Sequence, residues 1–147
     1  MSKILARGAL ALSLCLLASP AAAQDAPAVF DAVFPEGRLT AALDSLMDAV
    51  ELAPDENIRV VDLGRGEMSS HHLVFIRGDE TPHTHDDRDL FAIVLRGSGA
   101  MLQGEDERPV GEGSIVFVPR GTVHAFLNRG DEPAVAFVIF GAAPEQG

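Results

Sequence analysis

Apolar residues after Asn57 come in short runs of the length of β-strands. The runs span residues 58–63, 72–76, 90–95, 100–103, 114–118, 123–127 and 135–140. Between them stand clusters of Gly, Pro, Asp and Asn, the residues that tight turns demand. About seven short strands with turn signals between them predict one antiparallel β-sandwich or β-barrel, without an internal repeat or a second domain.

The segment before these runs follows a helical period instead. Between positions 39 and 52, apolar residues recur on one side and acidic residues fall on the other: Leu39, Leu43, Leu46, Met47 and Val50 against Asp44, Asp48 and Glu51. This pattern predicts one amphipathic helix, and its acidic stripe is typical of a solvated face. Residues 24–35 predict an extended arm that packs on the barrel or on a neighbouring subunit.

The first 23 residues have the layout of a signal peptide. Lys3 and Arg7 precede an apolar run from Ala9 to Ala18, and three alanines stand before Gln24. This run is shorter than the roughly 20 apolar residues of a membrane-spanning helix. We therefore predict a periplasmic or secreted protein that does not insert into a membrane after leader removal. Its parts are a signal peptide (1–23), an arm and helix (24–56), a barrel (57–141) and a tail (142–147).

The composition of residues 24–147 excludes several kinds of site and partner. The single cysteine, Cys15, lies within the leader, so the remainder has no thiol for a disulfide, a nucleophile or a thiolate metal site. That remainder holds nine arginines, no lysine and 22 acidic residues, a formal net charge of −13. Nucleic acid is not expected as a partner, because affinity for it comes largely from a basic surface.

Two histidines stand close together in the stretch TPHTHDDRD. In an extended segment alternate side chains share a face, so His83 and His85 can direct two imidazoles at one point. Taken alone, this H-x-H pattern is a weak indication of a metal. A second element follows in GSIVFVPRGTVHAFLN, where a turn at Pro119 and Gly121 fixes where His124 points.

This second stretch resembles the second motif of the cupin family, G-x5-P-x-G-x2-H-x3-N. It matches at every specified position, through Gly113, Pro119, Gly121, His124 and Asn128. The first cupin motif, G-x5-H-x-H-x3/4-E-x6-G, is matched by Gly78, His83, His85 and Gly97, with four residues rather than five between Gly78 and His83. The resemblance covers roughly residues 57–141.

The resemblance implies an all-β fold, an antiparallel jelly-roll β-barrel, preceded here by the one N-terminal amphipathic helix. It also implies one divalent transition metal inside the barrel, bound by His83, His85 and His124. An imidazole-rich site suits Fe, Mn, Co, Ni, Cu or Zn, and the sequence does not choose among them.

The fourth ligand of most metal-binding cupins is a glutamate of the first motif, and no glutamate stands there. Counted forward from His85 the position is Asp89; counted back from Gly97 it is Leu90, which cannot bind a metal. Two arrangements follow: three imidazoles plus Asp89, or three imidazoles with the remaining positions open to water or ligand. We favour Asp89, because a cation among neutral imidazoles in a low-dielectric barrel favours an anion beside it, and Asp87 could serve from further out.

Two further histidines, His71 and His72, begin the strand before the first motif. Adjacent residues of a strand point to opposite faces, so at most one of them is expected to enter the barrel.

Two functions of different classes remain open. Three protein ligands leave coordination positions for a small organic molecule, water or dioxygen, which predicts a metalloenzyme of the dioxygenase, decarboxylase, lyase or isomerase class. The fold does not choose among these reactions. The alternative is a non-catalytic module that binds a small ligand or a metal. Small cupins commonly pair, so the arm around Phe30 and Phe34 is also a candidate for exchange within a homodimer.

Overall fold

Strands dominate the part of the chain that the computed structural model describes, which is residues 28–34 and 37–142. The predicted signal peptide, residues 1–23, lies outside the described residues, as does the predicted tail apart from Ala142. The elements in chain order are β1 (Val29–Phe34), β2 (Gly37–Ala42), α1 (Leu43–Asp48), β3 (Ile58–Arg65), β4 (Ser69–Ile76), β5 (Arg88–Arg96), β6 (Ser98–Gln103), β7 (Asp106–Gly111), β8 (Ile115–Val118), β9 (His124–Asn128) and β10 (Ala134–Ala142).

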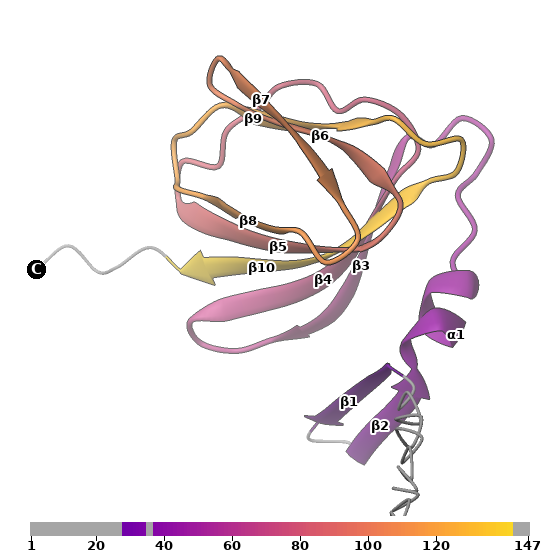
Figure 1. Cartoon of the computed structure of the whole chain (residues 1–147). Coiled ribbons are helices and arrows are strands. Elements are labelled where there is room, and N and C mark those ends of the chain that lie inside the picture. Colours follow the sequence, from indigo (N-terminus) through magenta and orange to yellow (C-terminus); the bar gives the residue numbers. More distant parts are fainter. Residues whose placement is uncertain (1–27, 35–36, 143–147) are drawn as a thin grey trace, which may run out of the picture.

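Two antiparallel sheets form the barrel (Figure 1). The larger sheet has the strand order β3-β4-β10-β5-β8, and the smaller one has the order β7-β6-β9. Neighbouring strands in both sheets pair antiparallel, although many of them are far apart in sequence. The predicted all-β antiparallel jelly-roll barrel is therefore confirmed.

Strand β4 is buried on both faces, which explains its continuous apolar run. Val74 and Ile76 point into the barrel, where they join a core cluster with residues of β5, β6, β8, β9 and β10. Leu73 and Phe75 point the other way and pack with Met47 of α1 and with Val135. A strand with apolar neighbours on both sides needs no polar alternation.

The helix is shorter than the sequence pattern predicts. Only residues 43–48 are helical, because residues 37–42 pair with 29–34 as the β1–β2 hairpin. The apolar side of α1 covers the outer face of the larger sheet, and its acidic residues Asp44 and Asp48 reach Arg96 at 3.4 and 2.8 Å. Both aspartates are well exposed, so these ion pairs add little stability. Within the described residues, no helix has the length and apolar character that crossing a bilayer requires.

Within the two sheets of the barrel, β7 was not predicted. Its sequence, DERPVG, holds a proline and four exposed residues, and the turn residues of 104–106 and 109–113 overlap both of its ends. Pro109 is tolerated there because β7 pairs only with β6 and lies at the edge of the smaller sheet.

Candidate metal centre

The loop between β4 and β5 runs along β9 and brings distant histidines together. His83 and His124 exchange both backbone hydrogen bonds, at 3.0 and 2.9 Å, and form an isolated antiparallel bridge. Further along, Asp79 and Leu127 form a second bridge. The loop is thereby fixed in an extended conformation beside β9.

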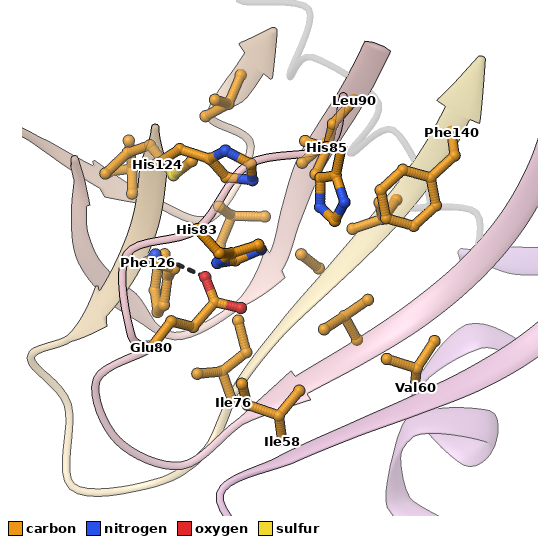
Figure 2. A pocket seen from close by; sticks show the side chains of 18 residues that line it. Ile58, Val60, Ile76, Glu80, His83, His85, Leu90, His124, Phe126 and Phe140 are labelled. Carbon is orange, nitrogen blue, oxygen red and sulfur yellow. Dashed lines mark hydrogen bonds between the residues drawn. The ribbon is translucent and has the colours of Figure 1, made fainter. Parts of the chain in front are cut away.

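Three imidazoles converge at this place (Figure 2). One nitrogen each of His83, His85 and His124 lies within 4.8 Å of the others. The ring centroids are 5.0 Å apart for His83 and His85, 4.5 Å for His83 and His124, and 5.1 Å for His85 and His124. The two histidines of the extended loop share a face, as alternation predicts, and β9 supplies the third.

Backbone carbonyls orient two of these rings. Nδ1 of His83 donates to the carbonyl of Thr81 at 3.0 Å, and Nδ1 of His124 donates to that of Thr122 at 2.9 Å. With the proton on Nδ1, the lone pair of Nε2 is free to bind a metal, the usual arrangement of a histidine ligand.

The surroundings of Nε2 of His124 show whether these residues fit a metal ion. It is buried, and it has no hydrogen-bond partner among the described residues. Burial of a polar atom without a partner is costly, and a cation at the centre of the three rings would take up this lone pair. The residues present therefore fit a metal.

The environment of His85 also favours the neutral, metal-binding form. Burial, and then the neighbouring His124 and His83, lower the pKa of its imidazole below the ordinary value. The ring packs edge-on against Phe140 with centroids 5.0 Å apart. The guanidinium of Arg88 lies over the same phenylalanine, 5.7 Å from its centroid.

The histidines open onto a cavity of about 260 Å³ inside the barrel. Aliphatic and aromatic side chains form most of its wall, and Ile58 and Val60 of β3 are 37% and 55% exposed, so the cavity meets solvent along that edge. The described residues place one charged side chain, Glu80, on this wall and no arginine or lysine. The volume suits a small ligand, since it falls just below the usual range for drug-sized molecules.

Comparison with known proteins identifies the group of proteins to which this barrel belongs. A sequence profile described as "Cupin domain" matches residues 72–140. An uncharacterized protein of Aquifex aeolicus (strain VF5) is 36% identical over 85 residues, which make up 58% of this chain and 69% of that protein. The chain belongs to the cupin family.

Solved structures share the cupin fold. TT1209 from Thermus thermophilus superposes with a TM-score of 0.59 at 23% identity, over 67% of this chain and 95% of that one. The cupin domain of Schizosaccharomyces pombe Cnp3 superposes with a TM-score of 0.60 at 12% identity, over 79% of this chain and 87% of that one. At these identities the likeness extends to the fold alone.

The second cupin motif forms the corner that supports the centre. Gly121 has a φ of +71°, which favours glycine, and its N–H donates to the carbonyl of His85 at 2.9 Å. Asn128, at the end of the motif, donates from its amide to the carbonyls of Ile76, Arg77 and Glu132. The motif therefore ties the start of the histidine loop to β9 and its end, at His85, to the turn before β9.

Asp89, the carboxylate predicted as fourth ligand, lies away from the cupin centre. On β5, Leu90 lines the cavity, so Asp89 points to the opposite face of the sheet. Its oxygens accept hydrogen bonds from the backbone N–H of Arg120 at 2.9 Å and from its guanidinium at 3.3 Å. These bonds lower the pKa of the Asp89 carboxyl, the backbone bond most. Asp87 likewise pairs with Arg88.

His71 and His72 point to opposite faces of β4. His71 is half-buried and stacks on Phe137, with centroids 6.3 Å apart. His72 is buried, bonds Ser70 at 2.8 Å through Nε2, and meets the edge of Phe140 at 5.5 Å. Burial lowers the pKa of its imidazole. Since His85 also packs on Phe140, that ring separates His72 from the centre.

Sequence reasoning missed Glu80, which reaches the cavity through an irregularity in the loop. Counting back from His83, alternation would place residue 81 on the inner face rather than 80. Four steps separate Asp79 from His83, but only three separate their partners, Leu127 and His124, so the loop holds one extra residue. This shift turns Glu80 inward, and Pro82 is the signal that could have indicated a break in the alternation.

The position of Asp89 predicts that metal affinity does not depend on its carboxylate. Asp89→Ala should leave the dissociation constant of the bound metal within about twofold of the parent value, while the free energy of unfolding falls through loss of the bond to the Arg120 N–H. Competition against a chelator of known affinity measures the first quantity and denaturant unfolding the second. Asp87→Ala is the matched control. A tenfold loss of metal affinity in Asp89→Ala alone would return Asp89 to the ligand set.

Proposed function

We propose that this cupin is an exported metalloenzyme that acts on a small organic molecule at a centre of His83, His85 and His124. The observation that carries the proposal is the buried, unpartnered Nε2 of His124, which lies with the other two imidazoles in a set of ligand atoms within 4.8 Å. The metal is a divalent transition ion of the kind that imidazoles bind, Fe, Mn, Co, Ni, Cu or Zn.

A centre with three protein ligands is typical of a catalytic metal site, which keeps at least one position open, whereas a structural site is closed by a fourth protein ligand. Here the described residues bring three imidazoles together and leave the cavity beside them. A bound ion there would polarise a ligand oxygen or lower the pKa of a bound water.

A second function, a non-catalytic module for a small ligand or a metal, is favoured by the composition of the wall. Apart from the histidines, Glu80 is the one ionisable side chain among the described cavity-lining residues. A reaction with several proton transfers would therefore depend on Glu80 and metal-bound water.

The metal site is tested by removing its ligands one at a time. We expect the parent protein to retain close to one equivalent of a divalent transition metal after dialysis, and His83→Ala and His124→Ala to bind it at least ~100-fold more weakly, since even partners of ligands change affinity by ~10–100-fold. Elemental analysis and chelator competition measure both. His71→Ala, which removes an imidazole from the outer face, should behave as the parent.

Equal metal in all four proteins would contradict the site. Where metal is bound, oxygen consumption and product formation with small alcohols, phenols, thiols and carboxylates distinguish the enzyme from the carrier. Turnover that disappears in His124→Ala supports the metalloenzyme. Tight ligand binding by the parent without turnover would instead favour the binding module.

Export and pairing complete the proposal. The leader pattern at residues 1–23 supports export, and the β1–β2 hairpin supports pairing, because Val29, Val33 and Leu39 on it are 55%, 76% and 46% exposed. An isolated two-stranded hairpin is marginally stable, and a second copy of the chain would cover these side chains.

Recovery of the protein from the bacterium that produces it tests export and pairing together. We expect mass spectrometry of the intact protein to give the mass of a chain that begins at Gln24. We expect the protein to elute from gel filtration at the size of a dimer. A variant that lacks residues 24–42 should elute as a monomer. Retention of residues 1–23 would contradict export, and unchanged elution of the shortened variant would contradict pairing through the hairpin.

A further inference from the structure

Glu80 is the one charged side chain on the cavity wall among the described residues. It is half-buried, and Figure 2 shows it on the histidine loop with its carboxylate directed into the cavity. An ionised carboxylate in apolar surroundings is costly without a partner, and no arginine or lysine of the described residues lines this space. A charged side chain in these surroundings indicates that a ligand pairs with it.

One oxygen of Glu80 has a structural role. The N–H of Glu80 donates to the carbonyl of Phe126 at 2.9 Å, and Oε2 of Glu80 accepts from the N–H of Phe126 at 2.7 Å (dashed in Figure 2). The extra residue in the loop removes the backbone acceptor that a regular ladder would offer to Phe126. The other oxygen, Oε1, has no hydrogen-bond partner among the described residues and remains able to accept one.

The carboxylate of Glu80 lines the same cavity as the histidines but stands outside their set of ligand atoms, which lie within 4.8 Å of one another. Its anchor, Phe126, follows His124 by two residues on β9, and both side chains line the cavity. Oε1 and the imidazoles therefore face the same cavity, where a small molecule can contact the imidazoles with one part and Oε1 with another.

Charge and polarity decide which molecule fits. A ligand carboxylate placed beside Glu80 would meet a second carboxylate and no cationic side chain of the described wall, and like charges at short range repel. A purely apolar ligand would leave Oε1 desolvated without a donor, which is also costly. A hydroxyl group satisfies Oε1, and the aliphatic wall receives the remainder of the molecule.

We propose that Glu80 determines specificity by accepting a hydrogen bond from the hydroxyl group of a small, uncharged, largely apolar ligand of the alcohol or phenol class. The inference rests on the proposed function, since the metal at the three histidines is the other polar feature of the cavity. Glu80 acts here as a hydrogen-bond acceptor in the binding step, and no covalent change is assigned to it.

Three probes of similar size test the inference on the metal-loaded parent protein. Phenol offers a hydroxyl, toluene offers none, and benzoate offers a carboxylate. We expect phenol to bind at least ~10-fold more tightly than toluene, because a hydrogen bond to a charged group changes affinity by ~10–100-fold. Benzoate, which a divalent ion attracts, is compared only between the parent and the Glu80 variant. Calorimetry or ligand-observed NMR gives the three dissociation constants, and elemental analysis of the same sample gives the metal content.

Glu80→Gln then separates the carboxylate from the rest of the wall. The amide oxygen can still accept from the N–H of Phe126, so the loop is retained. We expect phenol to lose ~10-fold in affinity, toluene to be unchanged and benzoate to gain. Glu105→Gln, the same substitution at an exposed turn, should reproduce all three parent values. Where Glu80→Gln fails to fold, Glu80→Asp, which keeps the charge on a shorter side chain, should lose the preference for phenol.

The outcomes distinguish this inference from the proposed function. Parent protein without metal contradicts the proposed function, and the inference falls with it. Metal-loaded parent that binds toluene as tightly as phenol overturns the role of Glu80 and leaves the metal site intact. An unchanged preference for phenol in Glu80→Gln overturns it as well.

Discussion

The backbone hydrogen bonds between His83 and His124 are the interaction on which the rest of the site depends. They attach a loop of the larger sheet to β9 of the smaller one. This attachment sets the register that places the three imidazoles within reach of one ion. A slip of one residue would turn every side chain of the loop to the other face, so the register specifies the site as strictly as the residues do.

The same attachment explains how polar groups are arranged in an apolar barrel. Two imidazoles donate to carbonyls two residues before them, which leaves their second nitrogens facing the cavity. Glu80 uses one oxygen to bond Phe126 and leaves the other free. In each of these side chains, one polar atom forms a hydrogen bond within the protein. The other polar atom faces the place where an ion or a ligand would lie. Groups pre-oriented in this way in a low-dielectric space interact strongly with what they bind.

Much of the fold follows from sequence pattern because the barrel is built by alternation. The runs at 58–63, 72–76 and 90–95 all lie within observed strands. Short apolar runs with turn residues between them are typical of strands joined by tight turns. The strand β7 escaped prediction because Pro109 and its polar neighbours are permitted at a sheet edge. The helix was predicted too long because pairing with a neighbouring strand overrode the helical period of residues 39–42.

The histidines of the candidate site were predictable, and the carboxylates were not. The cupin motifs fix the spacing of the histidines, and the structure brings all three together. The two ways of counting to the fourth ligand differ by one residue, and the structure places Leu90, not Asp89, on the inner face. Glu80 reaches that face only through an extra residue in the loop, which becomes apparent once the partners on β9 are known.

X-ray absorption of the zinc-loaded protein tests the three-histidine centre, because it counts the ligands of the ion. We expect three imidazole nitrogens at ~2.0–2.1 Å, with the remaining positions occupied by oxygen from water or ligand. The spectrum should be the same in Asp89→Ala. Fewer than three imidazoles in the parent, or an oxygen ligand that disappears in Asp89→Ala, would contradict the three-histidine centre.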